Sequence, residues 1–297
     1  MTTLTATASA FPEFKEKRYG VLWGILAAIA LGMMNFLVKF SLETIPSSEA
    51  VFARGLIGML LLTPLIYTKI PILLTRTGTI LWIRCIGGGI SVLCLFYNLQ
   101  RIGVGDATAL INLSTLFVVT FSWLVLKEAV SKIEWSGIGA IILGALILQS
   151  PFGSGLPLAA VLIGLLGAVT ASIAYIALRQ AAQRFSPLFV VWGFCFVSAL
   201  VSLCFPSQPW NIPDLPHFLL LIVMGLLGLA GQIWMTYAYM QLSAALACAL
   251  SLSSLIWGLT FESLYLMSIP KPIAFLSYGF ILVGVYILQV QHRGKRT

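Results

Sequence analysis

The sequence predicts an all-α membrane protein in which ten transmembrane helices form two inverted five-helix repeats, with both termini cytoplasmic. Composition predicts the class: of 297 residues, 60% are hydrophobic and 9% are charged, whereas a soluble domain carries about 25% charged residues. The apolar runs are long and unbroken, each close to the roughly 20 residues that a spanning helix needs. A membrane β-barrel would instead alternate in segments of about ten residues. The two repeats are predicted by a third observation, an internal match at one constant offset.

The internal match pairs Ile86–Gln149 with Leu226–Gln289, an offset of 140 residues without a gap. The matched residues include Gly88 with Gly228, Tyr97 with Tyr237, Ser114 with Ser254 and Gln149 with Gln289, and the same offset pairs Lys39 with Arg179. Self-similarity at a fixed offset indicates an internal duplication. Each copy holds five spans, and an odd number makes the second copy enter the membrane from the opposite side, as in many secondary transporters.

Prolines and short polar connections bound the predicted spans, because proline is tolerated in the first turn of a helix. The first repeat, residues 19–150, is predicted to hold spans Tyr19–Leu42, Ser47–Tyr67, Thr79–Gln100, Gly105–Leu126 and Ile133–Gln149. The second repeat, residues 157–290, is predicted to hold Leu158–Gln180, Pro187–Phe205, Phe218–Gln241, Ala244–Met267 and Ile273–Gln289. The two ends are predicted to be a disordered cytoplasmic tail (1–18) and a basic cytoplasmic tail (291–297).

The basic residues predict the orientation. With the N-terminus inside, the cytoplasmic segments collect twelve Lys and Arg residues and the opposite side keeps three. This is the positive-inside bias of membrane proteins, so the net charge of +8 does not indicate nucleic acid. Met1–Phe14 lacks both a charged n-region and an apolar h-region, which excludes a cleavable signal. We expect a multi-pass protein of the bacterial inner (cytoplasmic) membrane.

Four ionisable residues lie inside predicted spans, where charge is costly and usually functional. Arg54 lies about two turns into the second span from the outer side, and is interpreted as attracting a carboxylate or holding the outer gate. Lys39, Arg84 and Glu262 lie about one turn from a span end and are candidates for gating or coupling. Lys39 could equally snorkel to the interface, Arg84 could anchor its helix, and Glu262 could take a proton, bind a cationic group or pair with an arginine.

Polar and aromatic side chains in the middle of spans predict a central cavity. Lipid cannot satisfy amides and hydroxyls, so these groups must face other helices or water. A cavity with aromatic faces and a few hydrogen-bonding groups suits a small organic molecule with a planar part, and does not suit a bare ion. The predicted substrate-binding residues are Asn35, Arg54, Tyr97, Asn98, Asn112, Ser114, Tyr175, Gln232, Tyr237, Ser254 and Trp257.

The sequence carries no pattern for catalysis, a cofactor or a metal. It has no P-loop, no HExxH motif and no suitably placed Ser/His/Asp set, so we expect neither an enzyme nor a cofactor. The five cysteines lie inside apolar runs without metal-ligand spacing, and only two histidines are present. The cysteines are therefore predicted to be buried small hydrophobic residues, and no metal site is predicted.

Several segments resemble the drug/metabolite transporter superfamily, in particular its EamA-type ten-helix carriers. The resemblance rests on the closing helix Ser136–Gln149 (SGIGAIILGALILQ) and on the block Phe96–Glu128, with its run Asp106-Ala107-Thr108-Ala109 and its ending Leu126-Lys127-Glu128. Arg54 and Arg84 resemble arginines of the subset that includes S-adenosylmethionine and riboflavin carriers. The resemblance covers Tyr19–Gln289. It implies alternating access around a central site lined by spans one, three, four, six, eight and nine, with spans five and ten at the periphery.

One departure from the family pattern concerns the fourth and ninth spans. Many relatives have a proline in span four, where this chain reads Leu113-Ser114-Thr115-Leu116, and span nine reads Ser253-Ser254-Leu255. We expect the hydroxyl side chains to soften these two helices in place of a proline kink.

The sequence therefore predicts a secondary transporter that moves a small organic metabolite by alternating access. Amino acids and S-adenosylmethionine- or nucleoside-like compounds are the candidate substrates. A broad exporter of aromatic or drug-like compounds is the alternative within transport, and a non-transporting scaffold or receptor is the alternative outside it. The expected partners are the substrate and the lipid bilayer, without nucleic acid. Coupling to a proton or a counter-substrate, the direction of transport, and a monomer or homodimer are left open.

Overall fold

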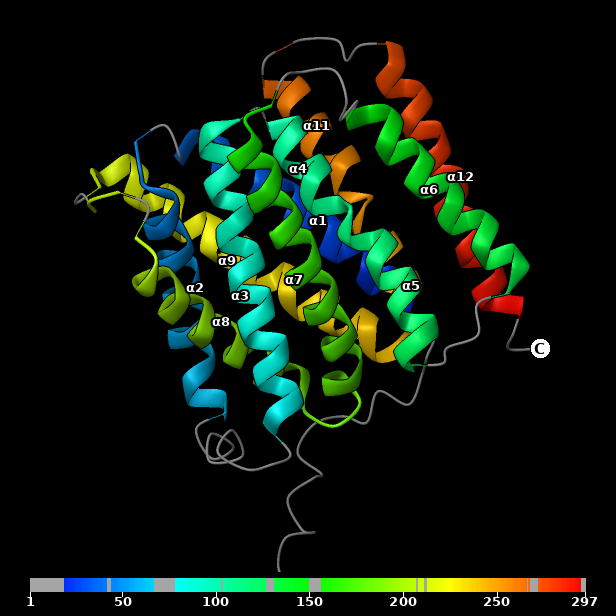
Figure 1. Cartoon of the computed structure of the whole chain (residues 1–297), viewed down its shortest axis with the longest axis horizontal. Helices are drawn as coiled ribbons and strands as arrows, with labels where there is room; N and C mark the ends of the chain where they lie inside the picture. Colours follow the sequence, from blue (N-terminus) through cyan, green and yellow to red (C-terminus); the bar gives the residue numbers. More distant parts are fainter. Residues whose placement is uncertain are drawn as a thin grey trace, which may run out of the picture.

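The chain folds as a bundle of apolar helices, and the described residues contain no strand (Figure 1). The computed structural model describes residues 19–41, 44–66, 78–102, 104–126, 131–149, 156–206, 208–210, 213–265, 267 and 272–294. The predicted tail over residues 1–18 lies outside them. The last helix continues to Gly294, into the predicted basic tail over residues 291–297, and residues 295–297 lie outside the described ones.

Twelve helices are present in the described residues. Those of the first repeat are α1 (Gly20–Ser41), α2 (Ser47–Ile66), α3 (Thr79–Arg101), α4 (Val104–Asn112), α5 (Ser114–Leu126) and α6 (Lys132–Gln149). Those of the second repeat are α7 (Leu158–Ala182), α8 (Pro187–Cys204), α9 (Leu215–Gln241), α10 (Ala244–Ser251), α11 (Ser254–Tyr265) and α12 (Pro272–Gly294). Six of them, α1, α2, α3, α7, α8 and α9, are long and apolar enough to cross a membrane by length and composition.

The predicted fourth and ninth spans are not continuous helices. Each is broken near its middle, at Leu113 between α4 and α5 and at Leu252–Ser253 between α10 and α11. At both breaks the backbone makes tighter i→i−3 hydrogen bonds, such as Leu116 N to Leu113 O (3.0 Å) and Leu255 N to Leu252 O (3.1 Å). The Ser253 hydroxyl donates to Leu250 O at 2.7 Å, which offers that carbonyl a partner outside the helical ladder. Hydroxyl groups thus accompany the break in the second repeat.

The helices pack with an approximate two-fold relation between the repeats. Helix α1 packs against α9, and their repeat equivalents α7 and α3 pack against each other. Helix α2 packs on its own counterpart α8, and α6 on its counterpart α12. In Figure 1, α1 and α9 cross behind α3 and α7, so helices from the two halves of the sequence alternate through the bundle.

The two repeats run in opposite directions. The first residue of α1, Gly20, lies against Leu242 at the end of α9. The end of α9 also meets the end of α7, because Arg179 Nη1 donates to Tyr239 O at 2.7 Å. Helix α1 therefore begins at the face where its counterpart α7 ends, which is the geometry of an inverted repeat.

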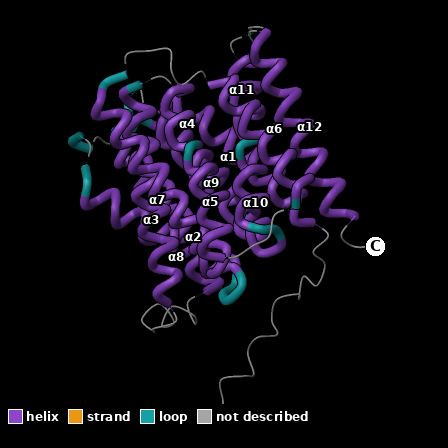
Figure 2. Tube along the Cα trace, turned by 45° about the vertical axis from the view of Figure 1, so that its right-hand side comes forward, coloured by secondary structure: helices purple, strands orange, loops and turns teal. Residues whose placement is uncertain are grey.

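Helices α6 and α12 form a peripheral pair at the side of the bundle (Figures 1 and 2). Small residues let them approach closely: a methyl group at Gly284 would lie 2.5 Å from Gly137 O, and one at Gly144 would lie 2.7 Å from Ser277 O. The offset of 140 residues pairs Gly144 with Gly284 and Gly137 with Ser277, so the same crossing is built from repeat-equivalent positions.

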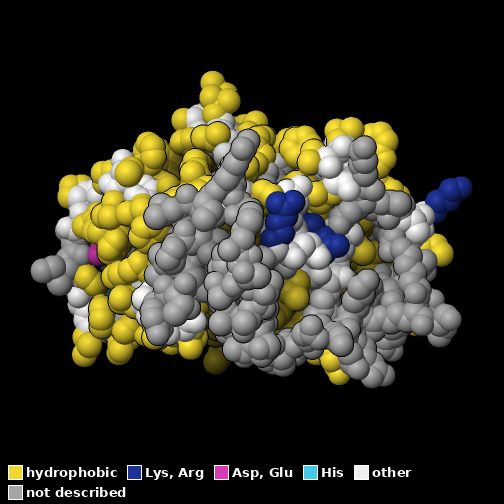
Figure 3. Space-filling view, turned by 90° about the horizontal axis from the view of Figure 1, so that it is seen from below, with side chains coloured by type: hydrophobic (Ala, Val, Ile, Leu, Met, Phe, Trp, Pro, Cys, Tyr) yellow, Lys and Arg dark blue, Asp and Glu magenta, His cyan; other side chains and the backbone are white. Residues whose placement is uncertain are grey.

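The outer surface is apolar, as expected for helices in contact with lipid. Leu60, Leu65, Leu162 and Tyr286 are among the large hydrophobic residues that are more than half exposed. Figure 3, the view from below Figure 1, shows hydrophobic atoms around much of the rim of this face, and Lys and Arg side chains near its centre and at its right-hand edge. Four of the five cysteines are buried as expected, and Cys204 at the end of α8 is exposed.

Candidate functional site: a central cavity between the repeats

A cavity lies between the two repeats and is lined by seven of the predicted spans. The empty space between its walls is about 760 Å³, a volume that includes solvent at the open side of the cavity. The apolar part of the lining comes from Leu31, Met34, Val92, Leu95, Ile111, Met235 and Leu255. The polar part comes from Asn35, Arg54, Ser91, Thr108, Asn112, Ser114, Tyr175, Gln232, Ser251 and Ser254. An apolar pocket with a few convergent polar groups is the usual form of a small-molecule site.

The structure brings many of the residues predicted from the sequence to this one cavity. They are Asn35, Arg54, Asn112, Ser114, Tyr175, Gln232 and Ser254. Sequence reasoning missed Ser91, Thr108 and Ser251 among the polar lining. The repeat carries a signal for Ser251, because lining positions recur at the offset: Asn35 with Tyr175, Val92 with Gln232, Ile111 with Ser251, and Ser114 with Ser254.

The other four predicted residues do not line the cavity. Tyr97 carries the guanidinium of Arg101 3.6 Å above its ring. Asn98 donates from Nδ2 to Ala160 O at 2.9 Å and so joins α3 to α7. Tyr237 packs on Trp23, with ring centroids 5.4 Å apart. Trp257 of α11 packs where Gly32 of α1 makes room for it.

Of the three residues predicted to act in gating or coupling, the structure describes the side chain of one, Arg84. The side chains of Lys39 and Glu262 lie outside the described residues. Arg84 is deeply buried, with 2% of its surface exposed. Its Nη2 donates to Gln232 Oε1 at 2.9 Å, so Arg84 reaches the wall of the cavity through a residue of the other repeat.

The guanidinium groups of Arg54 and Arg84 both lie close to the ring of Phe194, on α8. The guanidinium carbon of Arg84 lies 4.5 Å from the ring centroid and that of Arg54 lies 5.7 Å from it. Both distances are within the range of a cation–π interaction. Among the described residues, neither guanidinium forms an ion pair with a carboxylate. Arg54 on the cavity wall and Arg84 behind Gln232 are therefore two buried positive charges that form no ion pair within the described part of the protein.

Two repeat-equivalent glycines make room for these arginines. A methyl group at Gly88 would lie 2.3 Å from Arg84 Nη1, and one at Gly228 would lie 2.6 Å from Arg54 Nε. Any side chain at either position would displace a guanidinium. The glycine pair matched in the sequence thus positions the charged groups on the wall of the cavity.

One end of the cavity is closed by helices of the second repeat. Tyr175, on the cavity wall, stacks on Tyr239 with ring centroids 5.7 Å apart. Below this stack, Arg179 donates to Tyr239 O and Met240 O, and Gln183 Nε2 donates to Met240 O at 2.9 Å. These side chains satisfy the last carbonyls of α9, which have no partner within the helix, and hold α7 and α9 together.

The opposite end is not closed in the same way. The counterparts of α7 and α9 are α1 and α3, and they do not pack comparably in the part of the chain that the structure describes. Likewise α5 packs on α10, where the Cys248 thiol donates to Thr115 Oγ1 at 3.5 Å, whereas the equivalent pair α11 and α4 shows no comparable packing among described residues. The two-fold relation is broken at the ends of the cavity.

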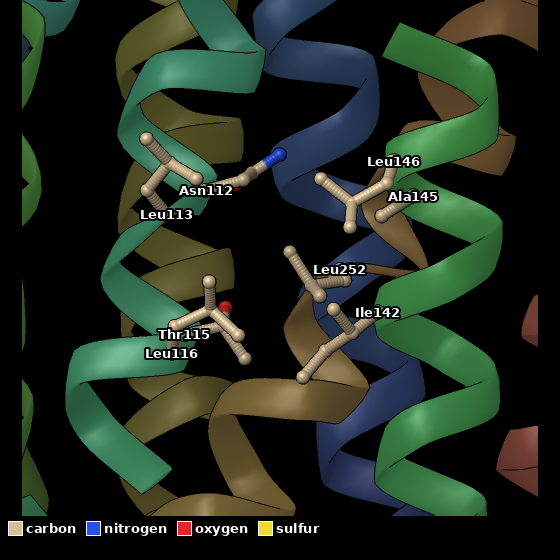
Figure 4. Close-up of a pocket in the computed structure, with 8 residues that line it drawn as sticks. All are labelled: Asn112, Leu113, Thr115, Leu116, Ile142, Ala145, Leu146 and Leu252. Carbon is tan, nitrogen blue, oxygen red and sulfur yellow. The ribbon is translucent and has the colours of Figure 1, made fainter. Parts of the chain in front are cut away.

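A smaller crevice lies next to the break between α4 and α5. It has an empty volume of about 280 Å³. Figure 4 shows Ile142, Ala145 and Leu146 of α6 facing Asn112 and Leu113, with Leu252 from the other break between them. Asn112 borders both this crevice and the central cavity. The two helix breaks are therefore adjacent, beside a mostly apolar space.

The sequence was compared with protein families and with known proteins. The model of the EamA-like transporter family matches twice, over residues 18–149 and 158–290. The chain belongs to the EamA-like transporter family. The resemblance noted in the sequence is confirmed, and the protein is a multi-pass membrane transporter with the two-repeat fold of that family.

The EamA assignment agrees with similar proteins of known sequence or structure. The pseudopaline exporter CntI of Pseudomonas aeruginosa is 30% identical over 277 residues, covering 93% of this chain and 97% of CntI. Human solute carrier family 35 member G1 is 24% identical over 282 residues, covering 87% of this chain and 76% of that protein. A crystal structure 20% identical in sequence superposes with a TM-score of 0.76 over 94% of this chain and 99% of its own, which shows a shared fold.

Proposed function

We propose that this EamA-family protein is a secondary transporter for a small organic metabolite that carries a carboxylate or another acidic group. Arg54 anchors that group in the central cavity. Alternating access moves the cavity opening from one side of the membrane to the other. Amino acids and S-adenosylmethionine-like compounds, which have a carboxylate, fit the proposal, whereas uncharged nucleosides do not.

The observation that carries the proposal is the environment of Arg54. Its side chain is 6% exposed, lines the cavity, and has only the ring of Phe194 as a charge-stabilising contact among the described residues. Burying a charge without a counter-charge is costly, so the arrangement favours a bound anion. Arginine is also the residue best suited to bind a carboxylate, because its fork of donors matches the two oxygens.

The topology belongs to the same proposal. Counting α4–α5 and α10–α11 as one broken span each, the helices supply ten spans. The excess of basic residues in alternate connections supports cytoplasmic termini and a bacterial inner membrane location. In that orientation the closed end, at α7 and α9, faces the cytoplasm and the cavity opens outward. CntI is an exporter, which supports export as the direction for this protein as well.

The experiment that tests the proposal is binding and transport by the purified protein in liposomes. Candidate amino acids, dicarboxylates and S-adenosylmethionine are first ranked by thermal shift, since a ligand that binds only the folded state raises its apparent stability. Uptake of the labelled best ligand is then measured for the wild type and for Arg54→Ala. We expect the variant to lose about tenfold or more in affinity, the effect of removing one charge-assisted hydrogen bond.

The matched control is Arg101→Ala, which removes an exposed arginine that lies on Tyr97 outside the cavity. It should bind and transport as the wild type does. Equal loss in both variants would argue against a specific anchor at Arg54. A wild type that transports none of the acidic candidates would contradict the proposed function itself.

A further inference from the structure

We propose that the substrate carries two acidic groups, and that Arg84 supplies the second positive charge of the site by acting through Gln232. This inference rests on the proposed function, because it concerns the same cavity and the same anionic class of substrate. It specifies how many negative charges of the substrate the site accepts. It also assigns Arg84, which does not line the cavity, a positioning role.

The first step of the argument is the charge count. Arg54 and Arg84 are 6% and 2% exposed, and they are the basic residues buried in the described part of the chain. Glu49, at the start of α2, is the acidic residue buried there, and it has interactions of its own. A ligand with one carboxylate would therefore neutralise one of two neighbouring charges and leave the other buried without compensation.

The second step is the fixed orientation of Gln232. A guanidinium can only donate hydrogen bonds, so the atom that accepts from Arg84 Nη2 at 2.9 Å must be the amide oxygen. The amide NH₂ group of Gln232 is then left to donate, and Gln232 lies on the cavity wall. Arg84 thus polarises an amide that presents its hydrogens on the same wall as the guanidinium of Arg54.

The third step concerns the hydrogen bonds of Arg84 itself, which are incomplete. Its Nε atom is buried and has no hydrogen-bond partner among the described residues. Its remaining support is the face of Phe194, which a second guanidinium shares. A cation–π contact stabilises a charge without cancelling it. The two guanidinium groups therefore attract anions into the cavity, and a single acidic group would neutralise only one of them.

The test compares ligands that differ by one negative charge and little else. Dissociation constants of the wild-type protein are measured at pH 7.5 for succinate against succinamate, and for glutamate against glutamine. We expect the ligand with the extra carboxylate to bind about tenfold more tightly, the usual effect of one further charge-assisted hydrogen bond. Equal affinities within both pairs would overturn the inference while leaving the proposed function intact. Absence of binding by all four would also overturn the inference, whereas the proposed function fails only if none of the acidic candidates in the thermal-shift screen is bound and transported.

A variant then tests the role of Arg84. Gln232→Glu keeps the shape of the side chain and places a carboxylate against Arg84, which neutralises the second charge within the protein. We expect the preference for the extra carboxylate to fall to about twofold or less. Gln180→Glu, the same substitution at a partly exposed glutamine of α7 that does not line the cavity, should keep the wild-type ratio. An unchanged ratio in Gln232→Glu would show that Arg84 has no part in recognition.

Discussion

At the scale of single residues, the charged groups of the cavity depend on space left by their neighbours. Arg54 reaches the cavity because Gly228 has no side chain, and Arg84 reaches Gln232 past Gly88. The two glycines are paired by the internal repeat, although the arginines are not: the repeat counterpart of Arg54 is Phe194. One repeat thus supplies the cation and the other supplies the aromatic face beneath it.

Gly228→Ala tests this dependence. The added methyl group would lie 2.6 Å from Arg54 Nε and 3.0 Å from Met34 Sδ, so the guanidinium must shift. Since the shift is confined to side chains, we expect the unliganded protein to remain folded and the affinity for an acidic ligand to fall several-fold. Thermal unfolding with and without ligand measures both effects.

The control for this variant is Gly279→Ala, because a methyl group there would meet nothing within 4 Å. It removes a glycine from α12, which should stabilise the helix by up to about 1 kcal/mol, and it should leave ligand affinity unchanged. If both variants bound ligand like the wild type, Gly228 would not be needed to position Arg54.

Much of the site could be predicted from depth and chemistry, and the failures have one cause. Asn35 and Tyr175 are polar groups in mid-span, and such groups must face protein or water. Tyr97 lies at a similar depth but on the side of α3 that faces away from the cavity. Ser91 and Leu95 face the cavity, and Tyr97 follows Leu95 by two residues, which turns its direction by about 200° around the helix. Depth follows from sequence position, whereas the facing direction depends on how α3 packs on α7.

At the scale of helices, the ends of α7 and α9 form the closed end of the cavity. Arg179 and Gln183 reach across from α7 to the last carbonyls of α9. These bonds are few and are made by two side chains, so they can be broken at moderate cost when the cavity changes sides. Their removal should shift the population towards the state that is open at this end.

Arg179→Ala tests this closure. In a background without native cysteines, Ser251→Cys places a thiol on the cavity wall, and its labelling by a membrane-impermeant reagent is followed from each side of a liposome. We expect the parent protein to react from the open side and the Arg179→Ala variant to react several-fold faster from the closed side, because the two helix ends are no longer joined.

Arg184→Ala is the matched control, since Arg184 lies nearby in the connection to α8 and is exposed. It should label like the parent. Equal labelling of the Arg179 variant and the control from the closed side would contradict a role for Arg179 in closure.

The helix breaks show what the sequence could not predict at this scale. Long apolar runs predicted Gly105–Leu126 and Ala244–Met267 as continuous spans, although the missing prolines and the serines pointed to softened helices. Apolar residues continue through Leu113 and Leu252 on both sides of each break, so hydropathy does not mark where the helix ends. The breaks become visible only where the backbone bonds tighten to i→i−3.

At the scale of the whole molecule, the internal repeat predicts the packing better than the hydropathy does. The match between Ile86–Gln149 and Leu226–Gln289 predicts that helix contacts between the repeats recur in reversed pairs, as α1–α9 and α3–α7 do. What a repeat cannot predict is the difference between the two ends of the cavity. That difference comes from which of two nearly equivalent sets of contacts is formed, and both sets are encoded in one sequence.

The two buried guanidinium groups also affect the return step of the transport cycle. If both ends closed around an empty cavity, Arg54 and Arg84 would be left in a water-poor space without a counter-charge, at considerable cost. A bound anion removes that cost, so the loaded protein should change sides much faster than the empty one. We expect labelled substrate to leave preloaded liposomes several-fold faster when unlabelled substrate is present outside, and Arg54→Ala to reduce this acceleration. Equally fast release into plain buffer would contradict it. We therefore expect the protein to exchange one anion for another, with the two substrate pools setting the direction.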